Sequence, residues 1–179
     1  MKIIAFVGMP ASGKSEASAV ARSLNIPVVS MGDVVREETA KQGLPPTDEN
    51  IGGVGTKLRR EEGMDAIAKR CVPRIRLQNS PVVVIDGIRN IDEINYFKQQ
   101  FGNDFKLIAI HAPLELRFER VKKRSRSDDM SNIDELKKRD ERENGWGLDK
   151  AIEKADITLE NTDSLDKFQN EIKKIFNIL

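Results

Sequence analysis

The residues best suited to chemistry lie in one short stretch near the start of the chain. Residues 8–15 read Gly-Met-Pro-Ala-Ser-Gly-Lys-Ser and match the phosphate-binding pattern G-x-x-x-x-G-K-[ST] at every fixed position. Glycines in such a turn let successive backbone N–H groups face a phosphate, and the helix that follows adds the positive end of its dipole. The residues expected to bind the phosphates of a nucleotide are Gly8, Ala11, Ser12, Gly13, Lys14 and Ser15.

Two side chains of this turn, Lys14 and Ser15, are predicted to bind phosphate and Mg²⁺, and the carboxylate of Asp86 could help to hold the metal. Lys14 is predicted to bridge the β- and γ-phosphates of ATP, and the hydroxyl of Ser15 is predicted to bind Mg²⁺. Asp86 follows the apolar run Val82–Ile85, as a carboxylate at the end of a buried strand would, and it could hold the hydration shell of the same Mg²⁺. The alternative for Asp86 is a turn or capping role before Gly87.

Three further charged residues could bind a second substrate. Arg89 follows Asp86 by three residues, at the same expected edge of a sheet, where its guanidinium could clamp an anion. Asp33 and Arg36 follow the strand-like run Val28–Ser30 and lie one helical turn apart. Arg36 could grip a phosphate with two hydrogen bonds, or form a solvated ion pair with a neighbour. Asp33 could be a helix N-cap or, for a hydroxyl acceptor, the general base.

A basic segment between residues 117 and 126 could neutralise a phosphoryl group in transfer. Six of its ten residues are Lys or Arg, and Arg120 and Arg124 share a helix face. Arg139 and Arg142 follow shortly afterwards. A phosphoryl group in transfer needs positive charge from several sides and the exclusion of water. The alternative is an ordinary charged helix with ion pairs along its surface.

The elements that must position these residues alternate along the chain. Five short runs rich in β-branched residues predict strands, and amphipathic patterns between them predict helices, so we expect a parallel sheet covered on both faces. The strand-like runs are Ile3–Val7, Val28–Ser30, Val82–Ile85, Leu107–His111 and Ile157–Leu159. Residues 31–79 and 117–147 interrupt this alternation and predict helical insertions, with breaks at Gly43–Pro46, at Gly52–Gly53 and near 127–132.

The composition limits the class of the protein. A length of 179 residues fits one domain, and 39% hydrophobic residues suffice for a core. The 30 Lys and Arg nearly balance the 29 Asp and Glu, which argues against a general nucleic-acid binder. One Cys and one His exclude an internal disulfide and a Cys/His zinc cluster. No apolar run approaches the ~20 residues of a membrane helix and the start lacks a signal-peptide pattern, so we expect a cytoplasmic protein.

The order of these motifs resembles adenylate kinase and its relatives. The matching pieces are the turn at 8–15, residues 30–38 (SMGDVVREE), Asp86-Gly87-Ile88-Arg89 and Arg120-x-x-x-Arg124, while residues 155–161 resemble the last strand of dephospho-coenzyme-A kinases. The nearest resemblance is to archaeal adenylate-kinase-related proteins, and it covers nearly the whole chain. It implies a three-layer α/β P-loop NTPase fold with a five-stranded core (1–30, 80–124 and 142–179), an acceptor-binding insertion (31–79) and a lid (125–141).

The resemblance implies roles for single residues on the acceptor side. Arg36 and Arg89 would bind the phosphate of a nucleoside monophosphate, most closely AMP, and neither a membrane nor a nucleic acid is an expected partner. The family usually has a proline between Asp-Gly-x and the second of these arginines, whereas here Ile88 is followed directly by Arg89. Two alternatives stay open: a kinase for a hydroxyl acceptor of the dephospho-coenzyme-A type, and a nucleotide-driven ATPase switch that acts on a protein or an RNA.

On the donor side, the resemblance implies contacts with ATP and with the phosphate in transfer. Arg120 would stack on the adenine of ATP, and Asn161 would lie near the same base. Arg124, together with Arg139, would reach the transferring phosphate. The implied cofactors are ATP and Mg²⁺.

Overall fold

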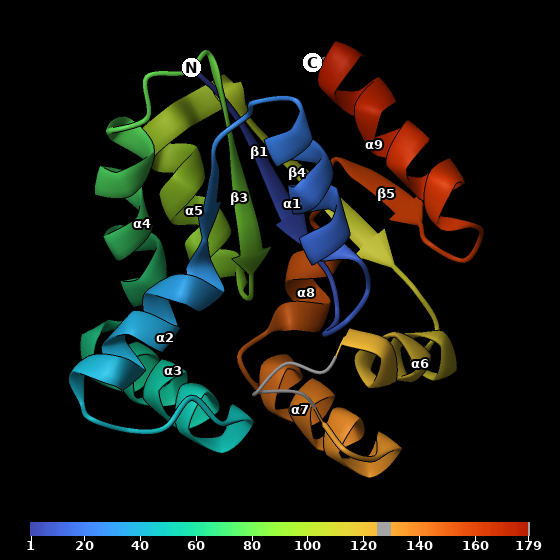
Figure 1. The fold of residues 1–179 in the computed structure, drawn as a ribbon. Coiled ribbons are helices and arrows are strands. Elements are labelled where there is room, and N and C mark those ends of the chain that lie inside the picture. The colour runs from blue at the N-terminus through green and yellow to red at the C-terminus, as the bar shows by residue number, and fades with distance from the viewer. Residues whose placement is uncertain (125–129, 179) are drawn as a thin grey trace.

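A five-stranded, all-parallel sheet forms the centre of the protein (Figure 1). The computed structural model describes residues 1–124 and 130–178. The strands are β1 (Lys2–Val7), β2 (Val28–Ser30), β3 (Val82–Ile88), β4 (Phe105–His111) and β5 (Ile157–Glu160), and their spatial order is β2-β3-β1-β4-β5. The predicted α/β fold class and all five predicted strands are confirmed.

Helices cover both faces of this sheet, as the alternating pattern predicts (Figure 1). The helices on one face are α1 (Lys14–Ser23) and α9 (Leu165–Ile178). The helices packed on the other face are α4 (Ala66–Arg76), α5 (Ile91–Phe101) and α8 (Leu148–Ile152), and the 3₁₀ helix η1 (Gly102–Asp104) joins α5 to β4. Within the described residues, no helix is both long and apolar enough to cross a lipid bilayer.

The central strand β1 shows why the sheet could be predicted from the sequence. Ile3, Ala5 and Val7 belong to the core cluster beneath α4 and α5, whereas Ile4 and Phe6 belong to the cluster beneath α1 and α9. Each of these five side chains is at most 2% exposed. Because successive side chains of a strand point to opposite faces, a strand buried on both faces reads as an unbroken apolar run.

Four helices lie beyond the carboxyl ends of the strands (Figure 1). They are α2 (Met31–Lys41), α3 (Asp48–Glu62), α6 (Leu114–Arg124) and α7 (Ile133–Gly145). The predicted break at Gly43–Pro46 is confirmed, since it separates α2 from α3. The break predicted near 127–132 falls partly outside the described residues. Val54 and Leu58 of α3 and Ile67 of α4 join the same core cluster as β1 and β3, so part of the range 31–79 packs in the core.

Two local expectations are wrong. Gly52–Gly53 does not interrupt the helices, because α3 runs without a break from Asp48 to Glu62. A Cβ on Gly52 would lie 2.5 Å from Cζ of Arg142, so this glycine makes room for a guanidinium rather than ending a helix. Asp33 is also not the N-cap of α2, because the Ser30 side chain accepts the hydrogen bond from its N–H.

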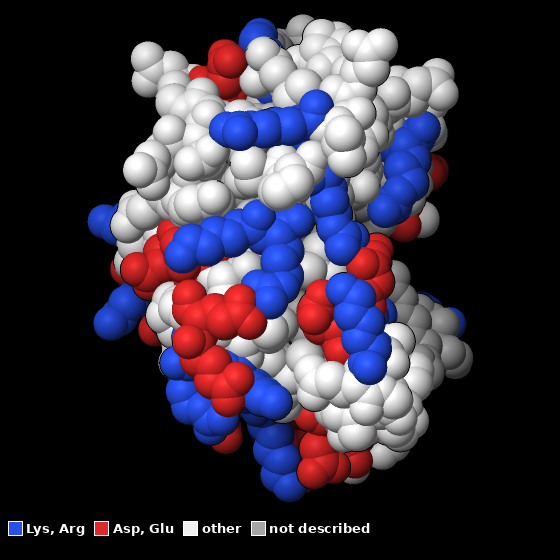
Figure 2. All heavy atoms as spheres, turned by 90° about the vertical axis from the view of Figure 1, so that its left-hand side faces the viewer, with Lys and Arg blue, Asp and Glu red and all other residues white. Residues whose placement is uncertain are grey.

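Charges of both signs alternate on the face that α2, α3 and α4 present (Figure 2). Exposed ion pairs join Arg74 to Glu37 and Arg70 to Glu62, with shortest N–O distances of 2.6 and 2.7 Å. Such solvent-exposed pairs contribute on the order of 0–1 kcal/mol each. They give this face a mixed charge instead of the continuous positive surface that binds the phosphate backbone of a nucleic acid.

Truncation of one core aromatic tests this packing. Phe97→Ala is expected to lower the free energy of unfolding by about 3–5 kcal/mol, because Phe97 is fully buried and its ring centroid stacks 6.0 Å from that of Phe105. Urea denaturation followed by circular dichroism measures the change. Leu77→Ala is the control: Leu77 is 82% exposed, and its truncation should cost less than about 0.5 kcal/mol. Equal losses in the two variants would contradict the described core.

Candidate active site

A cavity of about 680 Å³ opens at the carboxyl ends of the strands. Its wall combines the 8–15 turn with residues of α2, α3, β3, α6 and α7. The predicted site residues that line it are Ala11, Gly13, Lys14, Ser15, Arg36, Asp86, Arg89, Arg120, Arg139 and Asn161. Gly8, Ser12 and Asp33 are not part of this wall, and the side chain of Arg124 lies outside the described part of the structure.

The backbone of the turn has a shape that requires glycine at two positions. Gly8 and Gly13 have φ angles of 156° and 123°, which other residues rarely adopt. A Cβ on Gly8 would collide with the carbonyl oxygen of Ile110, and one on Gly13 would collide with the side-chain amide of Asn161. Gly13 is also the N-cap of α1, where no described side chain caps the helix. This helix N-terminus therefore presents its positive end toward the cavity, as an anion site would.

Lys14 is buried and folds back onto its own turn. Its Nζ donates hydrogen bonds to the carbonyl oxygens of Gly8 (2.6 Å) and Met9 (2.9 Å). Burial, together with the nearby charge of Arg89 and against the opposing effect of Asp86, lowers the pKa of Lys14 to about 7. A cation held at this position is poorly solvated, so an incoming phosphate would stabilise its charged form.

Asp86 lies inside the strand rather than at its end. β3 continues to Ile88 through Gly87, which has a φ of 101°, and the register with β1 shifts at this point. The Asp86 carboxylate accepts a hydrogen bond of 2.9 Å from the Ser18 hydroxyl and lines the same cavity as Ser15. This placement is consistent with the expectation that Asp86 lies at the edge of the sheet where ligands bind.

The donor set fits Mg²⁺ shared with phosphate better than a metal held by protein alone. Among the described residues, no group of three or more His, Cys, Asp or Glu side chains could hold a metal. Ser15 is exposed in the cavity, and Asp86 adds one carboxylate. Mg²⁺ commonly keeps several waters and takes its other ligands from one or two side chains and from substrate phosphates.

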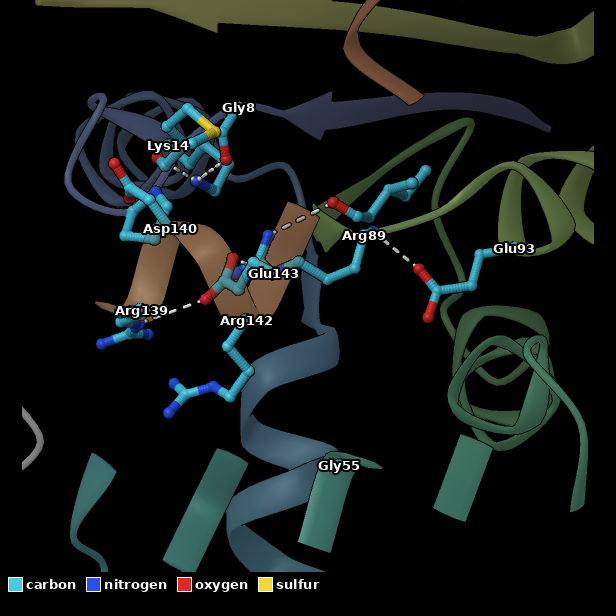
Figure 3. Close-up of polar contacts among 12 residues, drawn as sticks. Gly8, Lys14, Gly55, Arg89, Glu93, Arg139, Asp140, Arg142 and Glu143 are labelled. Atoms are coloured by element: carbon cyan, nitrogen blue, oxygen red, sulfur yellow. Dashed lines mark hydrogen bonds and ion pairs between the residues drawn. The ribbon is translucent and has the colours of Figure 1, made fainter. Parts of the chain in front are cut away.

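A buried carboxylate that the sequence did not single out lies among the arginines (Figure 3). Oε2 of Glu143 lies 2.8 Å from Nε of Arg89, and its Oε1 accepts a 3.1 Å hydrogen bond from Nε of Arg139. Burial alone would raise the pKa of Glu143, but the charges of Arg89, Arg139 and Lys14 lower it to about 2. Glu143 is therefore negatively charged at neutral pH beside these cations.

Contacts between α3 and α7 close one side of the cavity. Both terminal nitrogens of Arg142 donate to the carboxylate of Asp48, at 2.9 and 2.8 Å, and Arg139 lies 3.4 Å from the same carboxylate. The indole N–H of Trp146 donates to the Thr56 hydroxyl at 3.2 Å. These contacts join α3 to α7 and to Trp146 directly after α7, although the two helices are far apart in the sequence.

Arg36 and Asp33 form an ion pair with each other. Nη1 of Arg36 lies 3.0 Å from Oδ1 of Asp33, one turn away on α2. Arg36 lines the cavity, whereas the Asp33 side chain is 60% exposed and outside the wall. The structure thus contains the ion pair that was the alternative for Arg36, and it keeps this guanidinium at the cavity.

Arg120 and Asn161 tie the turn to the end of β5. Arg120 donates to the carbonyl oxygens of Ser12 (3.2 Å) and Asn161 (2.7 Å), and the Asn161 side chain donates to Ser12 at 2.9 Å. Both residues line the cavity next to the turn. The two residues that the resemblance assigns to the adenine therefore lie together.

Arg117 is a second residue that was missed, although it lies in the predicted basic segment. It is 4% exposed, donates to the Pro10 carbonyl at 3.0 Å, and binds both carboxylate oxygens of Asp140 at 3.0 and 2.7 Å. The only sequence signal was its spacing of three from Arg120, which places both on one side of α6. Glu143 has a similar signal, since it follows Arg139 by four residues.

Comparison with known proteins places the chain in a family. The family described as AAA domain matches residues 7–137. A UPF0200 protein of Methanosarcina acetivorans is 56% identical over 177 residues, which cover 99% of this chain and 95% of that protein. A UPF0200/UPF0201 protein of Archaeoglobus fulgidus is 62% identical over 98% of this chain, which spans only 55% of that protein's length. The chain belongs to the UPF0200 family and carries this AAA domain.

Solved structures similar to the chain show its fold. A Thermus thermophilus protein gives a TM-score of 0.62 at 20% identity, covering 99% of this chain and 97% of its own. A gluconokinase of Sinorhizobium meliloti gives 0.58 at 18% identity, covering 96% and 89%. The shikimate kinase of Aquifex aeolicus gives 0.54 at 21% identity, covering 98% and 96%. The P-loop kinase fold implied by the resemblance, and by the motifs that carry it, is confirmed.

Removal of one buried carboxylate tests the support of the site. Glu93 is fully buried, pairs with Arg59 at 2.9 Å, and accepts the backbone N–H of Arg89 at 2.6 Å. Glu93→Ala should lower the free energy of unfolding by about 3–5 kcal/mol, because it leaves a buried guanidinium unpaired. Thermal and urea unfolding measure this loss.

The matched control is Glu61→Ala, which removes a carboxylate from an exposed pair with Arg60. Its unfolding free energy should change by less than about 0.5 kcal/mol. If the free energy of unfolding of Glu93→Ala changes as little as that of this control, the Arg59–Glu93 pair does not stabilise the structure beneath the site.

Proposed function

We propose that the protein is a Mg-ATP-dependent kinase that transfers the γ-phosphate to the phosphate of a nucleoside monophosphate, most closely AMP. The observation that carries this proposal is that the phosphate-binding turn and a set of arginines line one cavity. The turn would hold the donor phosphates, and Arg36 and Arg89 would hold the acceptor phosphate. The P-loop kinase fold of the structural neighbours agrees with such a reaction.

At the donor end, the residues of the turn would bind and orient the phosphates. Lys14 would leave the carbonyl oxygens of Gly8 and Met9 for the β- and γ-phosphates, since a phosphate offers a full charge where the carbonyls offer only dipoles. Ser15 and Asp86 would hold Mg²⁺, which neutralises charge on the phosphate oxygens when it is bound. Arg120 and Asn161 would flank the adenine.

At the acceptor end, the positive charge of the arginines would be the main source of catalysis. An oxygen of the acceptor phosphate can attack directly, so no general base is needed, and catalysis consists of positioning and charge neutralisation. Asp33, the candidate base for a hydroxyl acceptor, is exposed, paired with Arg36 and outside the cavity wall. This arrangement favours a phosphate acceptor over a hydroxyl.

The same proposal assigns separate roles to two segments of the chain. Residues 31–79 would form the acceptor-binding insertion and residues 125–141 the lid, of which 130–141 are described. Arg139 of α7 would reach the phosphate in transfer. Arg124 would do so as well, as the resemblance implies.

A substrate panel tests the proposed function. The protein is incubated with Mg-ATP and, in turn, AMP, GMP, CMP, UMP, the deoxynucleoside monophosphates and dephospho-coenzyme A, and ADP formation is measured. Phosphate transfer to a nucleoside monophosphate, abolished in Lys14→Ala, supports the proposal. Transfer only to dephospho-coenzyme A would replace it with a hydroxyl kinase. ATP hydrolysis that no acceptor changes, but that RNA or a protein fraction stimulates, would replace it with a switch.

Proton uptake tests the role of Lys14. With its pKa at about 7, Lys14 is largely neutral at pH 8.5 and charged at pH 6. Phosphate binding raises this pKa. When Mg-ATP binds, the protein should therefore take up roughly one proton per site at pH 8.5 and roughly a tenth of a proton at pH 6. Calorimetry in buffers of different ionisation enthalpy measures the uptake. Lys14→Met should remove it, and uptake that is equal at both pH values would assign the proton to another group.

Truncation of Arg36 tests the acceptor end. Arg36→Ala should raise KM for the acceptor about 10-fold or more, as expected for a lost charge-assisted hydrogen bond, and should leave KM for ATP within about twofold. Steady-state kinetics with each substrate varied in turn measures both constants. Lys41→Ala, which removes an exposed cation from the same helix, is the control and should change neither. Equal increases in both KM values would place Arg36 outside the acceptor site.

A further inference from the structure

Glu143 connects arginines that come from different elements. Arg89 follows the end of β3, whereas Arg139 lies on α7, one turn before Glu143. One carboxylate oxygen lies 2.8 Å from Nε of Arg89, and the other accepts a hydrogen bond from Nε of Arg139. The carboxylate side chain is 3% exposed, and the two guanidinium-bearing side chains are 16% and 14% exposed. Figure 3 shows Glu143 between them.

A buried carboxylate at this place needs a physical reason. Desolvation of a charged carboxylate is unfavourable unless cations compensate it. Here the compensation comes from Arg89, Arg139 and Lys14, which are three of the cations that the proposed reaction uses. Without an anion among them, these cations would repel one another in a cavity that holds no phosphate, and the two long arginine side chains would turn away.

We propose that Glu143 is a positioning residue that holds Arg89 and Arg139 as a pair, one for the acceptor phosphate and one for the phosphate in transfer. This inference rests on the proposed function. Both contacts engage the Nε side of a guanidinium. Nη1 of Arg89 donates to the Ile88 carbonyl at 3.2 Å and Nη1 of Arg139 lies 3.4 Å from the Asp48 carboxylate, so a phosphate would have to compete with these partners for the terminal nitrogens. Because the arginines are ordered before the substrate arrives, less reorganisation is needed in the transition state.

The Glu143→Gln variant separates this role from simple packing. Glutamine has the same shape but one acceptor oxygen instead of two, so it can accept a hydrogen bond in the place of one carboxylate oxygen only. We expect kcat to fall about 100-fold while KM for ATP stays within about twofold. Glu143→Asp keeps both oxygens on a shorter side chain and should recover part of the lost kcat.

The control is Glu141→Gln, which removes an exposed carboxylate from the same helix. It should leave kcat and both KM values within about twofold. An unchanged kcat in Glu143→Gln would overturn the proposal. So would a loss that appears only as a lower unfolding temperature, since a purely structural carboxylate would produce that result.

A spectroscopic measurement decides the positioning role even if the kinase assignment fails. The Nε–Hε signals of Arg89 and Arg139 are assigned in ¹⁵N-labelled protein by comparison with Arg89→Lys and Arg139→Lys. Slow solvent exchange of both signals in the parent protein, and fast exchange of at least one in Glu143→Gln, support the proposal. Two signals that stay protected in Glu143→Gln would overturn it. A parent protein that phosphorylates no acceptor would overturn the proposed function alone.

Discussion

A cluster of cations that is shielded from water can persist only with anions among it. Lys14, Arg89 and Arg139 meet at one cavity, and Glu143 and Asp86 lie close enough to affect the charge of Lys14. The rest of the site follows from this constraint, because every arginine that lines the cavity except Arg120 lies beside a carboxylate. A ligand with several phosphate oxygens would find the positive charge already arranged and only partly neutralised.

The strand order explains how distant residues meet there. β1 and β3 are adjacent although residues 8–81 separate them, so the turn after β1 lies beside Asp86 of β3 and Arg89 just after that strand. In a parallel sheet, ligands bind beyond the carboxyl ends of the strands. The helices α2, α3, α6 and α7 all lie at that edge and provide the side walls of the cavity (Figure 1).

The parts of this protein that could be predicted from sequence are those whose signal is local. The phosphate-binding turn is contiguous, and the doubly buried strands read as apolar runs, so both were predicted. Glu143 and Asp48 were missed because their partners include residues far away in the sequence, and neither spacing nor composition shows such pairs. Gly52 was misread for the same reason, since the guanidinium that it accommodates belongs to Arg142, 90 residues later.

The buried guanidinium of Arg117 connects the phosphate-binding turn to α7. It bonds the carbonyl of Pro10 in the turn and both oxygens of Asp140, the residue directly after Arg139. The packing of Ala11 against the apolar cluster of Val121 and Leu136 reinforces this connection. A planar group cannot stretch, so any displacement of the turn either breaks these bonds or carries α7 with it. A ligand that moved the turn would therefore have to break these hydrogen bonds or move α7 as well.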